Sequence, residues 1–173
     1  MNQDTEAEII RRILDGDRQA YALLVDEYKA PIYNLAYRMT SNQQDAADLT
    51  QDIFTRAYTY LWRYNTRKKF FTWLYTIALN TIRNQIKKNK QYKNARAQDL
   101  KEQQYSENQN LAEAQDINVY LSGLDEETRA FIIMKYVQEL SFEEIAKITG
   151  KSVSALKMRI YRGLDKLKEM LEK

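Results

Sequence analysis

Residues 140–167 read LSFEEIAKITGKSVSALKMRIYRGLDKL, and this stretch carries the most specific local pattern in the chain. Ser141, followed three residues later by Glu144, predicts a capping box, which fixes the start of a short helix. Gly150 can adopt the left-handed conformation that ends this helix, and Ser152 can cap the next one. Two helices joined by such a tight, glycine-containing turn predict a helix-turn-helix.

The second helix of this pair has two chemically different sides. Its apolar stripe repeats with a helical period and is expected to be buried: Val153, Leu156, Ile160, Leu164 and Leu167. The opposite side gathers four residues that can enter a DNA groove: Lys157, Met158, Tyr161 and Arg162. Arg159 lies on the flank, where we expect it to contact a phosphate rather than a base. The alternative is an ordinary surface hairpin of two helices.

The rest of the chain predicts an all-α protein, because it combines one proline and four glycines with long apolar patterns of period 3.6. Predicted helices span about residues 5–14, 43–62, 72–90, 114–121, 126–137, 142–148 and 153–171, and another begins near residue 17. Pro31 is expected to kink or restart that helix, because proline removes a backbone donor. Asn42 is expected to cap the helix that follows.

These helices divide into two small helical domains joined by a flexible linker. Residues 1–91 hold enough apolar positions for one helical bundle. Residues 92–113 are polar and rich in Gln and Asn, so they bury too little apolar surface to hold a fold of their own. Residues 114–173 form the second domain, which contains the helix-turn-helix.

The composition argues against several classes of function. The 173-residue chain contains no histidine and no cysteine, which excludes the common zinc sites, thiol nucleophiles, Ser-His triads and disulfides. Its four glycines form no phosphate-binding glycine loop. We therefore expect no enzyme, no metal and no other cofactor. The polar N-terminus lacks the apolar core of a signal peptide, and no stretch predicts a membrane helix, so we expect a soluble, cytoplasmic protein.

The net charge of +3 averages four segments of very different charge. Residues 1–62 carry a net charge of −4, residues 63–101 carry +10, residues 102–128 carry −7 and residues 129–173 carry +4. Two separate basic segments favour contact with a polyanion at two places, although solvated helix faces are the alternative.

The +10 segment interleaves aromatic and basic residues. One part of it lacks apolar periodicity and is expected to form an exposed binding loop: Tyr64, Asn65, Thr66, Arg67, Lys68 and Lys69. Aromatic rings among positive charges suit unstacked bases and their phosphates, so this loop is a candidate single-strand platform. Phe70 and Trp73, which follow it, are better explained as core residues.

The segment DAADLTQDIF, residues 45–54, places Asp45, Asp48 and Asp52 on one helix face. Paired carboxylates suit acid–base chemistry or a metal. Because the chain has no histidine and no second carboxylate cluster to complete such a site, a solvated face or a protein-docking face is favoured.

Three motifs, taken together and in order, resemble the extracytoplasmic-function sigma factors of bacterial RNA polymerase. DAADLTQDIF is similar to the family's region 2.2, FFTWLYTIALNTIRNQI at residues 70–86 to its region-2.4 helix, and residues 140–163 to its region-4.2 helix-turn-helix. The resemblance covers nearly the whole chain outside the linker, and it implies a region-2 domain, a linker and a region-4 domain.

The resemblance also implies a role for each surface. Five residues would dock on the clamp helices of the largest polymerase subunit: Asp45, Asp48, Gln51, Asp52 and Phe54. The loop at residues 64–69 would capture an unstacked base of the −10 element, and the next helix would track the adjacent strand through Asn80, Arg83 and Lys87. The recognition helix would read the −35 duplex with Lys157, Met158, Tyr161 and Arg162, helped by Arg159 on phosphates. The implied partners are polymerase core, including the flap of the second-largest subunit, promoter DNA and an anti-sigma factor.

Two other functions are compatible with the residues alone. A stand-alone helix-turn-helix regulator would use the first bundle for sensing or dimerisation, and it would bind an operator duplex without polymerase. A helical hydrolase built on Asp45, Asp48 and Asp52 would require a bound metal.

Overall fold

The computed structural model describes residues 3–99 and 117–172, and every regular element within those ranges is helical. The N-terminal part contains α1 (Gln3–Leu14), α2 (Tyr21–Thr40), α3 (Gln43–Tyr60) and α4 (Phe70–Asp99), with short 3-10 turns η1 (Arg18–Ala20) and η2 (Leu61–Arg63). The C-terminal part contains α5 (Ile117–Ser122), α6 (Glu126–Ile132), the π-helical turn η3 (Ile133–Val137), α7 (Phe142–Thr149) and α8 (Val153–Leu171). The predicted all-α class is confirmed.

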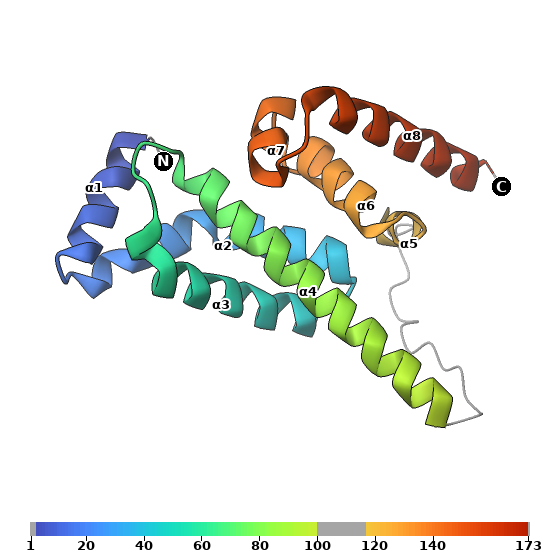
Figure 1. Cartoon of the computed structure of the whole chain (residues 1–173), viewed down its shortest axis with the longest axis horizontal. Helices are drawn as coiled ribbons and strands as arrows, with labels where there is room; N and C mark the ends of the chain where they lie inside the picture. Colours follow the sequence, from blue (N-terminus) through green and yellow to red (C-terminus); the bar gives the residue numbers. More distant parts are fainter. Residues whose placement is uncertain (1–2, 100–116, 173) are drawn as a thin grey trace.

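The N-terminal bundle is built on α2, α3 and α4, and α1 packs across one end (Figure 1). Each long helix turns an apolar stripe inward, and the stripes share one core that includes Leu24, Ile32, Ile53, Leu74 and Ile82. At the end covered by α1, the buried Tyr28 hydroxyl donates to the carboxylate of the buried Glu6, which ties α1 to α2. Two buried polar groups thereby satisfy each other.

Pro31, which is expected to kink or restart this helix, lies inside α2. That helix runs unbroken from Tyr21 to Thr40, so it does not restart at the proline. The buried Tyr28, Ile32 and Leu35 flank Pro31 on the stripe that faces the core. Their packing offsets the backbone donor that proline removes, since tertiary burial outweighs local propensity. The Pro31 carbonyl accepts a hydrogen bond of 2.8 Å from Nε2 of Gln138, the residue that follows η3.

Helix α4 continues to Asp99, beyond its predicted end near residue 90 and into the predicted linker. Residues 91–99, QYKNARAQD, lack glycine and proline and contain good helix formers, so their polarity does not prevent a helix. The first part of the predicted linker is therefore helical, and the remainder, residues 100–113, lies outside the described residues.

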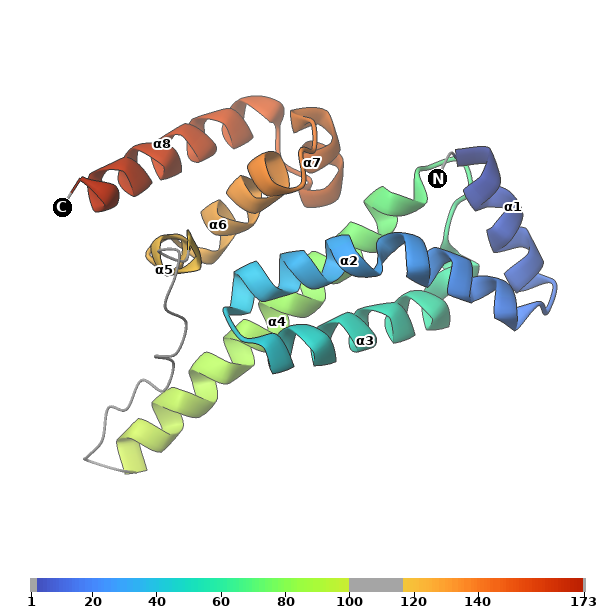
Figure 2. The same ribbon diagram turned by 180° about the vertical axis from the view of Figure 1, so that it is seen from behind.

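The C-terminal part packs α8 across α6, with α7 at one end of the pair (Figure 2). Its helix starts are capped: the side chains of Asp125, Ser141 and Ser152 each accept a bond from a backbone N–H of the turn that follows. The guanidinium of Arg129 donates to the carbonyls of Leu121, Ser122 and Leu124. Sequence analysis gave no role to Arg129, which fixes the connection from α5 to α6.

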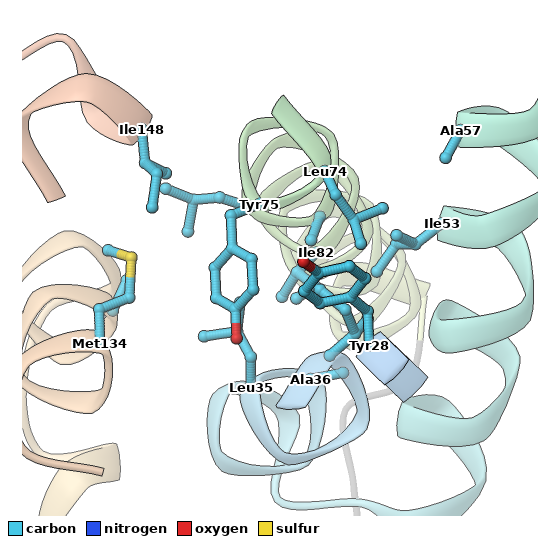
Figure 3. Close-up of a cluster of buried hydrophobic side chains, with 14 of the residues drawn as sticks. Tyr28, Leu35, Ala36, Ile53, Ala57, Leu74, Tyr75, Ile82, Met134 and Ile148 are labelled. Atoms are coloured by element: carbon cyan, nitrogen blue, oxygen red, sulfur yellow. The ribbon is translucent and has the colours of Figure 1, made fainter. Parts of the chain in front are cut away.

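The two parts pack against each other along α2 and α4 (Figures 1 and 2). In Figure 3, Tyr75 of α4 lies among Leu35 of α2, Met134 of η3 and Ile148 of α7, and all four side chains are buried. The Thr76 hydroxyl donates to the Ile148 carbonyl over 3.3 Å. The structure therefore shows a closed arrangement of the two helical units.

Candidate nucleic-acid interface

The helix-turn-helix has the local geometry that its sequence predicts. Ser141 and Glu144 form both hydrogen bonds of the capping box. The bond that the Glu144 carboxylate accepts from the Ser141 backbone N–H, over 3.0 Å, holds the pKa of that carboxyl below its usual value. Gly150 ends α7 with a φ of 72°, a left-handed conformation that glycine adopts without strain. The cap and the glycine together aim α8 across α7.

Helix α8 presents the predicted reading side to solvent. Lys157, Met158, Tyr161 and Arg162 are all exposed, and Met158 and Tyr161 each retain 53% of their accessible surface. On the opposite side Leu156 and Ile160 are buried, while Val153, Leu164 and Leu167 are half-buried. The apolar back therefore holds the helix on α6 and leaves its polar front free to enter a groove.

Gly163 is a buried position of α8 that sequence analysis did not single out. A Cβ added there would lie 2.5 Å from Cγ2 of Thr128 and 2.9 Å from Cδ1 of Ile132, both on α6. The crossing of α6 and α8 is thus close enough to require glycine. The sequence did contain a signal for this close crossing, namely a glycine within the buried stripe of the recognition helix.

Arg159 lies on the flank of α8, as expected, and its exposed side chain pairs with groups of α6 in the same unit. Its guanidinium pairs with Asp125 over 3.2 Å and with Glu127 over 2.6 Å, and its Nε donates to the Thr128 hydroxyl over 3.1 Å. All three partners belong to the start of α6 or its cap.

Tyr64 is buried, with 8% of its surface exposed, so its prediction as an exposed base-binding residue is wrong. Its ring packs edge-on against Phe70 at 5.5 Å and against Trp73 at 5.4 Å, and burial raises its pKa to about 12. Its hydroxyl donates to the Lys68 carbonyl. Tyr64 therefore anchors the loop from inside.

The five residues after Tyr64 are all exposed, as predicted: Asn65, Thr66, Arg67, Lys68 and Lys69. Asn65 shapes the loop, since its side-chain oxygen accepts from the Arg67 N–H over 3.0 Å and its carbonyl accepts from the Lys68 N–H over 2.9 Å. Lys69 pairs with Glu144 of α7 over 3.3 Å. The loop thus presents a compact positive surface on a rigid base.

Helix α4 follows this loop and carries the other predicted strand contacts. Asn80 and Lys87 are exposed, whereas Arg83 is half-buried and pairs with Glu127 of α6 over 3.4 Å. Phe70 is fully buried and Trp73 half-buried, which confirms their assignment to the core.

The acidic face of α3 is only partly the surface that the sequence predicts. Asp48 and Gln51 are exposed, Asp45 is half-buried, and Asp52 pairs with Arg56 over 2.8 Å. Phe54, also expected in the docking face, has only 6% of its surface exposed, and its side chain joins the core. No group of three or more potential ligands that could hold a metal occurs in the described part of the chain.

A groove of about 730 Å³ lies between α2 and α3, next to this acidic face. Its walls are mainly apolar, and its lining includes Tyr21, Val25, Tyr33, Phe54 and Tyr58. The Tyr21 hydroxyl donates to the Phe54 carbonyl over 2.7 Å, which fixes the two helices at this point. Sequence analysis missed the groove, although the aromatic residues on the outer side of α2 were a signal for it.

Comparisons with known proteins assign both parts of the chain. Residues 24–92 match the family model for Sigma-70 region 2, and residues 114–167 match the model for Sigma-70 region 4. The chain is 35% identical to the ECF RNA polymerase sigma factor SigW of Bacillus subtilis strain 168, with 94% of each chain covered. It belongs to the extracytoplasmic-function sigma factors. The chain is also 27% identical to the RNA polymerase sigma-H factor of Pseudomonas aeruginosa, over 99% of this chain and 96% of that one.

Solved structures agree with this fold. The structure of CnrH in complex with the cytosolic domain of CnrY is 23% identical, covers 96% of each chain and has a TM-score of 0.73. The sigma factor RpoE of Bartonella quintana in complex with the anti-sigma factor NepR is 22% identical, covers 88% of this chain and 96% of that one, and has a TM-score of 0.67.

This sigma factor is therefore a DNA-binding transcription-initiation protein. The N-terminal bundle matches Sigma-70 region 2, so the sigma-factor prediction is favoured over the stand-alone regulator whose bundle would sense a ligand or dimerise. Within the described residues, no helix is both long and apolar enough to cross a bilayer.

Proposed function

We propose that this sigma factor recruits polymerase core to promoters through three separate surfaces, with residues 1–91 acting as region 2 and residues 114–173 as region 4. The observation that carries the proposal is α8, whose exposed front and buried back have the arrangement of a DNA-reading helix. Lys157, Met158, Tyr161 and Arg162 read the −35 duplex from this front. Arg159 contacts a phosphate once its carboxylate partners release it.

The −10 element is bound as a melted strand by the loop after Tyr64 and by α4. Asn65, Thr66, Arg67, Lys68 and Lys69 supply the exposed polar and positive groups, and Tyr64 holds their backbone in place. Asn80, Arg83 and Lys87 extend the same positive surface along α4. Fixed positive groups beside an ordered loop suit a single strand, whose phosphates are read without regard to sequence and whose bases are unstacked.

Polymerase core docks on α3. Asp45, Asp48, Gln51 and Asp52 form the polar part of this surface, and the neighbouring apolar groove with Phe54 at its edge forms the rest. A mixed surface of this kind is typical of protein interfaces, where an apolar centre lies within a polar rim. The clamp helices of the largest subunit are the proposed partner here, and the flap of the second-largest subunit is the proposed partner of region 4.

The same surfaces are proposed to bind an anti-sigma factor. Support comes from two fold relatives that were solved as complexes, CnrH with the cytosolic domain of CnrY and RpoE with the anti-sigma factor NepR. We further propose that the chain acts in the cytoplasm without a cofactor and without catalysing a reaction of its own, since it works by presenting surfaces.

Transcription from a random promoter library tests the proposed function. The purified chain, added to polymerase core, is expected to select a set of promoters with common −35 and −10 sequences. Arg162→Ala is expected to lose selection at one −35 position, while Lys168→Ala, at an exposed basic residue near the end of α8, keeps it. Absence of promoter-dependent transcripts refutes the proposal, and tight binding to a duplex without core favours the stand-alone regulator.

A further inference from the structure

The acidic triplet Asp125, Glu126 and Glu127, at the cap and first turn of α6, contacts cations from both helical units. The carboxylate of Glu127 lies 2.6 Å from Arg159 Nη1 and 3.4 Å from Arg83 Nη2. Arg159 belongs to the helix-turn-helix and Arg83 to α4. One carboxylate therefore joins a proposed −35 contact to a proposed −10 contact.

Two further cations complete this cluster. Lys151, in the turn between α7 and α8, lies 3.4 Å from Glu127, and Lys90 of α4 pairs with Glu126. Glu127 retains only 17% of its side-chain exposure, so its charge is shielded from water by the groups it pairs with. Three cations surround the Glu127 carboxylate, which offers them a negative charge and hydrogen-bond acceptor oxygens. A DNA phosphate offers the same groups.

The closed arrangement that brings these groups together cannot engage a whole promoter. The −35 and −10 elements lie about 25 base pairs apart, which is roughly 80 Å at about 3.4 Å per base pair. Here, in contrast, residues proposed to serve the two elements share one carboxylate, and Thr76 of α4 bonds to the carbonyl of Ile148 in α7. The two units must separate before both elements are bound.

The seam between the units also contains a group that favours separation. The Tyr75 hydroxyl is fully buried there, and it has no hydrogen-bond partner among the described residues. A buried, unpaired hydroxyl loses the hydrogen bonds that water would give it, so it opposes closure. The ion pairs favour the closed arrangement of the two units, and the unpaired Tyr75 hydroxyl opposes it. Because the two contributions partly cancel, the units can separate.

We propose that Glu126 and Glu127 of this triplet act as an internal substitute for DNA phosphate, holding the free sigma factor closed and occupying Arg83, a proposed −10 contact, and its neighbour Lys90 until the chain opens. This inference rests on the proposed function, because it assigns a regulatory role to the residues proposed to contact DNA. Opening releases Arg83 and Lys90 together, whereas Arg159 stays paired with α6 of its own unit until a phosphate competes for it.

Single-molecule energy transfer in the full chain tests the proposal. Because the chain has no native cysteine, dyes can be placed at Ala22→Cys on α2 and Glu169→Cys on α8, both exposed positions. The double variant Glu126→Gln with Glu127→Gln is expected to raise the ratio of open to closed molecules by about fivefold or more. The matched control is Glu143→Gln, which removes an exposed carboxylate from the first turn of α7 and is expected to leave the ratio unchanged.

A second variant changes no charge. In the double-variant background, Tyr75→Phe removes the unpaired hydroxyl and is expected to return the ratio toward closed by about fivefold or more. The double variant is also expected to bind a fluorescent 30-nucleotide mixed-sequence single strand about tenfold more tightly than the Glu143→Gln control. If the double variant keeps its helical circular dichroism but neither its open fraction nor its affinity for the strand changes, the proposal is wrong.

Transcription by core with the wild-type chain separates this outcome from failure of the proposed function. A chain that transcribes, but whose open fraction does not respond to the acidic variants, refutes the internal phosphate substitute alone. If the acidic variants open but the wild-type chain supports no promoter-dependent transcript with core, the proposed function is wrong. The internal phosphate substitute is not contradicted by that result.

Discussion

Gly163 allows a quantitative test of how α8 is held on α6. Gly163→Ala would place a Cβ 2.5 Å from Cγ2 of Thr128, well inside an ordinary carbon contact of about 3.5–4.0 Å. Thr128 is buried and β-branched, so its χ1 is stiff, and its hydroxyl already accepts from Arg159 Nε. Relief therefore requires the helices to separate, a form of overpacking that costs about 1–3 kcal/mol.

The same substitution has a favourable part, because alanine is better than glycine in a helix by about 1 kcal/mol. Thr128→Ser separates the two effects, since it removes the methyl group that the new Cβ meets and keeps the hydroxyl for Arg159. In the serine background only Cδ1 of Ile132, the flexible end of a side chain 2.9 Å from the new Cβ, has to move. Most of the steric cost is then lost, and Gly163→Ala is expected to lie between neutral and a stabilisation of about 1 kcal/mol.

A double-mutant cycle of these two positions measures the contact. Urea unfolding followed by circular dichroism gives the free energy of unfolding for the four proteins, provided the slope with denaturant is unchanged. The expected coupling energy is about 1–3 kcal/mol. A coupling energy below about 0.5 kcal/mol would show that α8 adjusts freely on α6, and it would refute the view that Gly163 sets their approach.

Three further predictions concern the capping box, the loop and the docking face. Ser141→Ala is expected to lower the free energy of unfolding by about 1 kcal/mol. Glu144→Gln should flatten the pH dependence of thermal stability, because the lowered pKa of Glu144 gives stability that is present above pH 4.5 and lost as pH falls through the folded-state pKa, whereas Ser141→Ala keeps the backbone N–H that lowers this pKa most; an unchanged profile in Glu144→Gln would contradict this. Tyr64→Phe is expected to lower the free energy of unfolding by about 1 kcal/mol, because it loses the hydrogen bond to the Lys68 carbonyl. It is also expected to weaken binding of a single strand, measured by fluorescence anisotropy. An unchanged affinity and an equally ordered loop would show that Tyr64 does not anchor the loop. Asp48→Arg is expected to reduce binding to polymerase core in a pull-down while the melting temperature is kept, whereas Asp15→Arg, an exposed control outside α3, binds normally.

The sequence predicts the helix-turn-helix well because its determinants are local. A cap, a glycine and an apolar period all act within a few residues, and Ser141, Glu144 and Gly150 behave as their positions indicate. The same holds for the exposed front of α8, since a buried stripe at Leu156 and Ile160 leaves only one side for solvent.

The errors arise where distant contacts outweigh local pattern. Tyr64 looks like a loop residue, but Phe70 and Trp73 form a pocket for its ring, and no periodicity reveals that pocket. Pro31 remains helical because the stripe on both sides of it is buried. Phe54 faces the core because α2 covers it, which depends on how two helices cross rather than on the motif that contains it.

The charge segments acquire a structural meaning once the fold is known. Near its end the acidic segment at residues 102–128 contains Asp125, Glu126 and Glu127. Of these, Glu127 pairs with Arg83 and Glu126 with Lys90, both from the +10 segment. Opposite charges that are far apart in the chain therefore meet across the seam between regions 2 and 4. Residues 102–116 of the acidic segment lie outside the described residues.

Such a pairing is well suited to displacement by DNA. The ion pairs of the acidic triplet are partly exposed, so each contributes little on its own and weakens as salt rises. Duplex DNA presents one phosphate charge for about every 1.7 Å of its axis, a density that three carboxylates at one helix terminus do not match. When docking on core holds region 2 beside promoter DNA, the phosphates compete at high local concentration for the same cations. Binding of DNA and opening of the chain then become one coupled equilibrium, because each carboxylate displaced from Arg83 or Lys90 also removes a contact between the two regions.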